Sequence, residues 1–374
     1  TYFLLLITIK MRASKCNTPH RTILANRYAI ISKLDSSKSS EIYTVFDEKT
    51  GEIKVAKIYE NNFPRTFKKE TIIFKKLQKL ELSTNIKFYE SSIGDFTQNG
   101  HTTKKMYIIL EYGSKGCLFD ALNKTKKGFT EDVCQYILLN ILNAVEALHK
   151  NFICHRDLKI ENIVLVGNNR DIKLIDFGYA TKFVDENNQP KKLAKFVGTA
   201  YCCAPEILEG KPYDGVKADI FSIGATLFTL MTKRYGFKEA RINNISLEPE
   251  NLLYTKIKEK KYEEYWELIK KIKGVDNLSE KFKKLFLKMV AYSCGHLSLA
   301  DIPPLSVASG KQRWRFQHVP SPWPLSPDSF SGTVARACHH LLRWEMELPT
   351  LIANGATVWI MSSTGQSVTP CEYG

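Results

Sequence analysis

Two short strings of polar residues carry groups that could act on a hydroxyl group with the help of a metal ion. They read His155-Arg156-Asp157-Leu158-Lys159-Ile160-Glu161-Asn162 and, fourteen residues after Asn162, Asp176-Phe177-Gly178. The carboxylate of Asp157 could accept or orient the proton of a hydroxyl group. Asn162 and Asp176 offer oxygen atoms, and hard oxygen ligands suit Mg²⁺. The strings therefore predict a site for metal-assisted chemistry on a hydroxyl group.

A third string lies further along the chain and reads Gly198-Thr199-Ala200-Tyr201-Cys202-Cys203-Ala204-Pro205-Glu206. In this order the three strings resemble those of the eukaryotic protein kinase family, and the resemblance covers about Tyr28 to Tyr292. Lys159 and Thr199 resemble the serine/threonine-specific branch, and the pattern is similar to that of calcium/calmodulin-dependent kinases. The resemblance implies ATP- and Mg²⁺-dependent phosphorylation of serine or threonine hydroxyls in a protein substrate.

The resemblance also implies individual roles for residues of these strings. Asp157 would serve the substrate hydroxyl, and Lys159 would meet the migrating phosphoryl group. Thr199 would belong to the same catalytic set. Asn162 and Asp176 would be the Mg²⁺ ligands, because phosphoryl transfer depends on positioning and on neutralising charge.

A lysine in the N-terminal part of the chain is placed to bind the phosphates of a nucleotide. Lys57 follows Val55-Ala56 on a predicted strand, where the resemblance implies the lysine that holds the α- and β-phosphates. Glu70, inside the next predicted helix, would be its acidic partner. The resemblance implies further nucleotide contacts. Leu34, Ile42, Ala56 and Val164 would form apolar walls around the adenine, and Leu110 would be the gatekeeper. Glu111 and Gly113 would bind the adenine through their backbone, and Glu161 would lie near the nucleotide.

The glycine-rich loop that this family places over the phosphates lacks its glycines here. Asp35, Ser37 and Ser40 stand at those positions, and Ser39 stands at the tip. Glycine lets the backbone approach a phosphate closely, whereas serine adds a Cβ atom and Asp35 adds a negative charge. We expect weaker nucleotide binding or a slower reaction. The loop also favours an alternative, a pseudokinase that binds nucleotide or serves as a scaffold with weak or no phosphotransfer.

The activation segment departs from the family in its phosphate acceptor. Arg156 would normally pair with a phosphate on this segment. Lys195 stands near the usual acceptor position, and no Ser, Thr or Tyr lies between Thr181 and Thr199. The usual phosphorylation switch is therefore expected to be absent.

The end of the kinase-like region departs as well. After Tyr292 the chain continues as Ser293-Cys294-Gly295, in place of the Asp-Pro turn and arginine that the family places there. That arginine normally pairs with the glutamate at Glu206. We therefore expect a shortened helical lobe in which Glu206 lacks this partner.

The elements that would hold these residues change in type along the chain. Alternating or apolar runs predict strands at Tyr28–Leu34, Ile42–Phe46, Ile53–Tyr59 and Lys104–Leu110, with Gly51 in the second turn. Helical spacing predicts helices at 67–80, 130–148 and 219–231, and two basic amphipathic helices within 254–290. The order predicts an α+β protein with a small β-rich N-lobe at about 27–112 and a larger helical C-lobe at about 113–292. The resemblance implies that these lobes form the bilobal protein kinase fold.

The composition divides the chain into unlike parts. Of 374 residues, 44% are apolar and 25% are charged, which is typical of a globular protein. Residues 1–292 hold 49 Lys and Arg against 34 Asp and Glu, whereas residues 293–374 hold 5 against 5. The lysines are scattered, which favours solvated surfaces over a specific nucleic-acid site.

The last 82 residues also carry eight of the 14 prolines and four of the five tryptophans. We interpret residues 1–26 as an N-terminal extension and 27–292 as the kinase domain. Residues 293–374 read as a Pro/Trp-rich tail of different coding origin, with a genuine interaction tail as the alternative. We expect this tail not to fold with the kinase core.

Cysteine usage bears on the compartment. The nine cysteines are odd in number and form no Cys-x-x-Cys pair, which predicts a reducing, intracellular and cytoplasmic setting without a zinc site. The apolar run Tyr2–Ile9 has eight residues and is too short to span a membrane.

Overall fold

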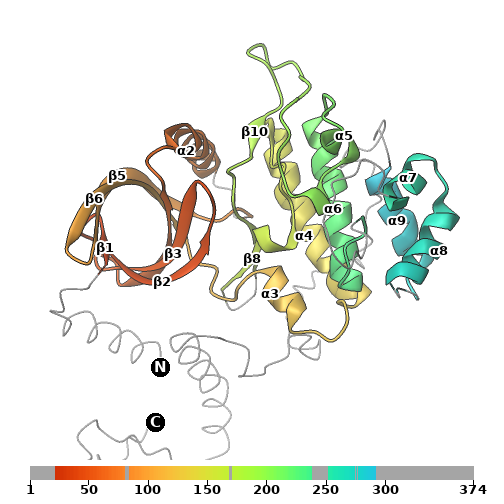
Figure 1. The fold of residues 1–374 in the computed structure, drawn as a ribbon, viewed down its shortest axis with the longest axis horizontal. Helices are drawn as coiled ribbons and strands as arrows, with labels where there is room; N and C mark the ends of the chain where they lie inside the picture. The colour runs from red at the N-terminus through yellow and green to blue at the C-terminus, as the bar shows by residue number, and fades with distance from the viewer. Residues whose placement is uncertain are drawn as a thin grey trace, which may run out of the picture. The chain divides into compact units, whose positions relative to one another are not determined.

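The computed structural model describes residues 22–80, 84–167, 171–237, 252–273, 275 and 277–291 (Figure 1). Within these residues, long strands gather in the N-terminal part and helices in the C-terminal part, which confirms the predicted α+β, bilobal fold. The predicted tail at 293–374 and the first 21 residues of the predicted extension lie outside the described residues. None of the described helices combines the length and the apolar character that a membrane span requires.

The N-lobe sheet is antiparallel and closes on itself, because β1 pairs with both β2 and β5. Its described strands are β1 (Ile23–Leu24), β2 (Tyr28–Ser36), β3 (Ser40–Asp47), β4 (Glu52–Tyr59), β5 (Phe88–Gln98) and β6 (His101–Glu111). The four predicted strands are confirmed as β2, β3, β4 and β6. Gly51 lies in the turn between β3 and β4 with a φ of +73°, a left-handed conformation that glycine adopts without strain.

Helix α2 (Pro64–Lys79) contacts β5 and β6, and it confirms the helix predicted for this region. Pro64 lies at the start of the helix, where its missing N–H leaves no intrahelical bond unmade. The buried face of α2 consists of Glu70, Thr71, Ile73, Phe74 and Leu77. Glu70 is therefore an acidic residue on an otherwise largely apolar face, which requires a partner for its carboxylate.

The C-lobe is built around α6 (Gly215–Thr232), in which every residue from Ala218 to Leu230 is buried. Asp214 caps this helix by accepting hydrogen bonds from the backbone N–H groups of Val216 and Lys217. Helices α4 (Glu131–Lys150) and α9 (Glu280–Val290) contact α6. Other described elements are α3 (Leu118–Asn123), α5 (Pro205–Leu208), α7 (Leu252–Lys258), α8 (Tyr262–Lys273), and the short paired strands β7 (Ile153–Cys154) with β10 (Thr181–Lys182) and β8 (Ile163–Val166) with β9 (Asp171–Leu174).

The prediction of two basic helices within 254–290 is wrong in number, because the described residues there form three helices, α7, α8 and α9. Lys260 has a φ of +57°, and this left-handed residue separates α7 from α8. Asn277 has a φ of +61° shortly before α9. Ser279 then caps α9 by accepting a hydrogen bond from the N–H of Phe282 at 3.1 Å. Backbone conformation at single polar residues thus divides a segment whose apolar spacing is nearly continuous.

One hydrophobic cluster runs through both lobes, and a smaller one fills the closed N-lobe sheet. Strand β4 contributes to both clusters because alternate residues face opposite sides of a sheet. Ala56 and Ile58 belong to the smaller cluster, whereas Tyr59 belongs to the larger. Phe177 links the lobes, since its ring lies 5.3 Å from that of Phe74 on α2 in an edge-on contact.

Candidate active site

The loop that carries Asp157 is fixed by a buried carboxylate from α6. Asp219 accepts hydrogen bonds from the backbone N–H groups of His155 at 2.9 Å and Arg156 at 2.7 Å. Arg156 has a φ of +69°, a conformation that an L-residue rarely adopts. The two bonds to Asp219 hold the loop in this turn, and the turn presents Asp157.

Asp157 is the centre of a cluster that contains all the predicted catalytic residues. The Thr199 hydroxyl donates to Asp157 Oδ1 at 2.7 Å, and Lys159 Nζ lies 3.1 Å from Asp157 Oδ2 and donates to the Thr199 hydroxyl at 2.8 Å. Asn162 Nδ2 donates to the Asp157 carbonyl at 2.9 Å and to its Oδ2 at 3.0 Å. Burial acts to lower the pKa of Lys159, but the Asp157 carboxylate outweighs it and raises that pKa, so Lys159 stays cationic.

A second cluster joins the two lobes through Lys57. Its Nζ donates to Glu70 Oε1 at 2.9 Å, to Glu70 Oε2 at 3.0 Å and to Asp176 Oδ1 at 2.8 Å. Burial acts to lower the pKa of Lys57, but the carboxylates of Asp176 and Glu70 outweigh it and raise that pKa well above its ordinary range. Burial likewise acts to raise the pKa of Asp176, but Lys57 holds it at about 2. The cluster therefore keeps a lysine and an aspartate in their charged forms at neutral pH.

The donor atoms of Asn162 and Asp176 fit the metal that the sequence implies. Asn162 uses its Nδ2 for the bonds to Asp157, which leaves its Oδ1 as the atom with ligand character. Asp176 is ionised and brings a carboxylate. Among the described residues, no group of three or more His, Cys, Asp and Glu side chains could hold a metal ion. Oxygen ligands such as these are the kind that Mg²⁺ takes, together with waters and phosphate oxygens.

The residues predicted to surround the adenine lie partly together. Ala56 and Leu110 are buried, and Ile42 is half-buried and pairs with Lys57 across the β3–β4 ladder. Gly113 and Val164 lie so close that a Cβ on Gly113 would sit 3.0 Å from the Val164 Cβ. Glu111 accepts hydrogen bonds from the backbone N–H of Lys87 and from Lys173 Nζ, which anchor its side chain. Leu34, which was also predicted to form an apolar wall, is by contrast 52% exposed.

Glu161 makes a contact that the sequence analysis did not foresee. Its Oε1 accepts a hydrogen bond from the Tyr201 hydroxyl at 2.5 Å. Tyr201 lies two residues after Thr199 and packs its ring 4.2 Å from that of Tyr235. This contact places Glu161 beside the segment that carries Thr199.

The serine-rich turn between β2 and β3 uses its N–H groups internally. Ser37 Oγ accepts from the N–H groups of Ser39 at 3.3 Å and Ser40 at 3.1 Å, and the Ser37 N–H donates to the Ser40 carbonyl at 2.8 Å. Asp35 Oδ1 accepts from the N–H of Ser36 at 2.7 Å. The backbone N–H groups of these four serines are thus already bonded within the loop, and a phosphate would have to compete for them.

Arg156 also has partners other than a phosphate. Its guanidinium donates twice to the Tyr179 carbonyl, at 2.8 and 2.6 Å, and once to the Tyr213 hydroxyl at 2.9 Å. The Tyr213 hydroxyl in turn donates to the Lys195 carbonyl at 2.9 Å. These bonds tie Arg156 to the activation segment through neutral groups.

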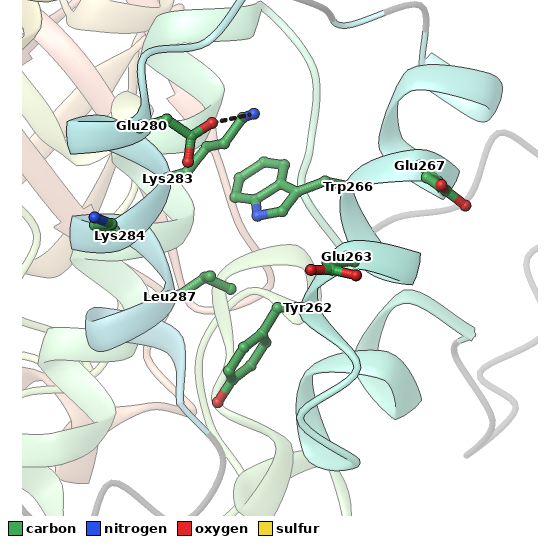
Figure 2. Close-up of a pocket in the computed structure, with 8 residues that line it drawn as sticks. All are labelled: Tyr262, Glu263, Trp266, Glu267, Glu280, Lys283, Lys284 and Leu287. Carbon is green, nitrogen blue, oxygen red and sulfur yellow. Dashed lines mark hydrogen bonds and ion pairs between the residues drawn. The ribbon is translucent and has the colours of Figure 1, made fainter.

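A separate surface groove of about 430 Å³ opens between α8 and α9 (Figure 2). It is lined by Tyr262, Glu263, Trp266, Glu267, Glu280, Lys283, Lys284 and Leu287. Figure 2 shows Glu280 paired with Lys283 beside the Trp266 ring. None of these residues belongs to the clusters around Asp157 and Lys57.

The structure brings Asp157, Lys159, Asn162 and Thr199 into contact, and it places Lys57 against Glu70. Sequence reasoning missed Tyr59, whose hydroxyl donates to Glu70 Oε2 at 2.5 Å. The available signal was its position two residues after Lys57 on a strand, which places both side chains on one face.

Comparison with known proteins supports the same family as the motifs and their arrangement in the structure. The family model described as "Protein kinase domain" matches residues 28–296, well over half of the chain. The SNF-related serine/threonine-protein kinase of Rattus norvegicus is 41% identical over 140 residues, which cover 37% of this chain and 18% of that protein. The serine/threonine-protein kinase SRK2E of Arabidopsis thaliana is 29% identical over 234 residues, which cover 62% and 59%.

The serine/threonine-protein kinase ppk25 of Schizosaccharomyces pombe is 35% identical over 157 residues, covering 42% of this chain and 34% of that protein. The chain thus spans less than two thirds of the length of each of these relatives. The family match includes β2 to α9 and every residue of the polar clusters around Asp157 and Lys57. The chain belongs to the protein kinase domain family.

Proposed function

We propose that this chain transfers the γ-phosphoryl group of ATP to a serine or threonine hydroxyl of a protein substrate, with Mg²⁺. The observation that carries the proposal is the cluster around Asp157, where Thr199, Lys159 and Asn162 all bond to one buried carboxylate. Such a carboxylate is held in one orientation before any substrate arrives, which is what positioning a reactant requires. The names of the relatives support serine and threonine as acceptors.

In this proposal Asp157 accepts a hydrogen bond from the incoming hydroxyl and orients its oxygen toward the phosphoryl group. Lys159, kept cationic by Asp157, stabilises negative charge near that oxygen. Thr199 holds both side chains in place through its hydroxyl. Glu161, bonded to Tyr201 beside Thr199, belongs to the substrate side of the site in our assignment, and not to the nucleotide side.

Lys57, Asn162 and Asp176 form the phosphate side of the proposed site. ATP supplies the transferred group and Mg²⁺ neutralises its charge when both are bound. Asn162 Oδ1 and the Asp176 carboxylate would hold the metal, and Lys57 would bind phosphate oxygens. Glu70 would keep Lys57 directed toward them. We assign the adenine to a position among Leu34, Ile42, Ala56, Leu110 and Val164, with backbone bonds from Glu111 and Gly113. We assign the catalytic domain to residues 27–292.

A substitution at Asp157 tests this function in the full chain. Asp157→Asn removes the anionic acceptor but keeps the size of the side chain, so phosphate transfer from labelled ATP to a generic protein should fall about 10²- to 10⁴-fold. ATP affinity should stay within about twofold, because Asp157 faces the hydroxyl. Phosphoamino-acid analysis of the product should give phosphoserine or phosphothreonine.

The matched control is Asp132→Asn, which makes the same change on the exposed first turn of α4. It should leave transfer unchanged. Equal transfer by the Asp157→Asn variant and the parent protein would contradict the assignment of Asp157. Absence of transfer by the parent chain itself, at any Mg²⁺ concentration, would contradict the function.

A further inference from the structure

Tyr59 is placed by strand β4 to act on the same carboxylate as Lys57. The two residues are separated by one position, so their side chains leave β4 on the same face, toward α2. Ile58, between them, faces the smaller cluster inside the closed sheet. Tyr59 has no exposed surface and Lys57 is 8% exposed. A buried tyrosine requires a partner for its hydroxyl, and the face it shares with Lys57 determines which one it finds.

That partner is Glu70. The Tyr59 hydroxyl donates to Glu70 Oε2 at 2.5 Å. The Tyr59 ring also meets Phe67, one turn before Glu70 on α2, edge-on at 5.4 Å. Lys57 Nζ lies 5.7 Å from the centre of the Tyr59 ring. Tyr59 therefore contacts α2 at two points and touches both members of the Lys57–Glu70 pair.

Glu70 shares its cationic partner, Lys57, with a second carboxylate. The Glu70 carboxylate is 1% exposed, so both of its oxygens need donors from the protein. The Lys57 ammonium is divided between Glu70 and Asp176, which it contacts at comparable distances of 2.8 to 3.0 Å. A hydroxyl fixed to the strand supplies a donor that is not divided in this way.

We propose that Tyr59 is a positioning residue for the phosphotransfer inferred above, acting through Glu70. Its hydroxyl holds Glu70 Oε2, and the carboxylate fixed in this way, which Lys57 contacts through both oxygens, sets the direction of the ammonium. The assignment rests on the proposed function, and it adds to that function a residue on β4 that ties α2 to the catalytic lysine.

The competing explanation is that Tyr59 only satisfies a buried hydroxyl. Tyr107 offers a matched comparison within the same sheet. It is 4% exposed, and its hydroxyl donates to Glu90 at 3.0 Å, but it belongs to the smaller cluster and does not face α2. Loss of the hydroxyl at Tyr107 changes a buried tyrosine without touching the Lys57–Glu70 pair.

The test is a double-substitution cycle in the full chain, with kcat and KM for ATP as readouts. Tyr59→Phe keeps the ring and its contact with Phe67 and removes the hydroxyl alone. It should lower kcat/KM for ATP about tenfold, mostly through kcat, because the ammonium remains charged but is less well directed. Tyr107→Phe should change kcat/KM less than about twofold.

The decisive arm combines Tyr59→Phe with Glu70→Ala. If Tyr59 acts through Glu70, its loss should change kcat/KM less than about twofold in that background. An equal effect in both backgrounds, or an equal effect of Tyr107→Phe, would overturn the proposal while leaving the kinase function intact. A parent chain that transfers no phosphate would instead overturn the function. Thermal unfolding of each variant checks that it is folded, and Glu70→Gln replaces Glu70→Ala if that variant is not.

Discussion

Lys69 lies beside Glu70 on α2, and the cations Arg156 and Lys195 act on it more strongly than Glu70 does. Burial lowers the pKa of Lys69 to about 8, with further contributions from Arg156 and Lys195. Lys195 stands where the family would place a residue that accepts a phosphate. No Ser, Thr or Tyr lies between Thr181 and Thr199, so no phosphate can be attached there to stabilise these cations. Because burial and these two cations outweigh Glu70, the positive charge on Lys69 should cost stability at neutral pH.

The pKa of Lys69 sets the pH window of this cost. The folded-state pKa lies below the ordinary value of 10.5, so the folded protein binds fewer protons between about pH 8 and pH 10.5. Stability attributable to Lys69 therefore rises with pH through that window, and the full cost is present below about pH 8. Lys69→Gln should raise the melting temperature by about 1–3 °C at pH 7, and this gain should shrink toward pH 10.

Lys68→Gln is the matched control, since Lys68 is exposed on the same helix. It removes the same charge from the adjacent position and should shift the melting temperature by less than about 1 °C. A gain from Lys69→Gln that is equal at pH 7 and pH 10 would argue against a titrating, partly buried ammonium. The measurement is thermal unfolding of the full chain across this pH range.

At the scale of elements, the β2–β3 turn explains how a loop without glycines keeps its shape. Ser37 takes up the N–H groups of Ser39 and Ser40, so the turn is closed by its own side chain. A nucleotide phosphate would have to compete with Ser37 Oγ for these donors. Replacing Asp35, Ser37 and Ser40 together with glycine removes this competitor, one negative charge and three Cβ atoms.

The triple replacement should lower the KM for ATP by about three- to tenfold, because the released N–H groups can turn toward phosphate. Ser36→Gly is the control, since it adds backbone freedom at a position where the family has no glycine. An unchanged or higher KM in the triple variant would mean that the turn does not approach the phosphates. Steady-state kinetics at varied ATP concentration decides between these outcomes.

The elements differ in how far sequence alone could predict them. Strands β2, β3, β4 and β6 carry dense Ile, Val and Tyr runs, whereas β5 reads Phe-Tyr-Glu-Ser-Ser-Ile-Gly-Asp-Phe-Thr-Gln and was not predicted. Most of β5 is only half-buried, so its polar residues hide the alternation. The division of 254–290 into three helices depends on left-handed residues such as Lys260, and such a conformation leaves no mark in apolar spacing.

In the candidate site, residues that lie in motifs could be predicted from the sequence, whereas contacts that depend on the fold could not. Asp157, Asn162 and Asp176 lie in strings whose spacing is set by the chemistry, so the sequence could name all three, although Asp176 lies in the cluster around Lys57 and the other two lie in the cluster around Asp157. Tyr59 carries no motif, and its role follows from which face of β4 meets α2. The partner of Glu161 could not be predicted because it depends on how the segment after Thr199 folds back.

At the scale of the whole molecule, the C-lobe depends on a tight contact between α6 and α9. Gly224 on α6 lies against Met289 and Val290 of α9, both of which have no exposed surface. A Cβ at position 224 would lie 2.8 Å from Val290 Cγ1 and 2.9 Å from Met289 Cβ. Neither neighbour is the far end of a flexible side chain, so the helices would have to separate.

Gly224→Ala therefore sets two effects against each other. Alanine favours the helical conformation over glycine by about 1 kcal/mol. Overpacking of a tight core costs about 1–3 kcal/mol. Because α9 carries Phe282 and Phe286 into the same core, a shift of α9 disturbs more than the two residues in contact. We expect a net loss of about 1–2 kcal/mol, which lowers the melting temperature by about 2–6 °C.

A second substitution tells a clash from a general effect on α6. Val290→Ala removes the methyl group nearest to position 224, so the double variant Gly224→Ala/Val290→Ala should lose less stability than the two single variants added together. Additive losses would place the cause within α6 itself, and a Gly224→Ala variant as stable as the parent would show that α9 has room to move. Urea or thermal unfolding of the four proteins measures the difference.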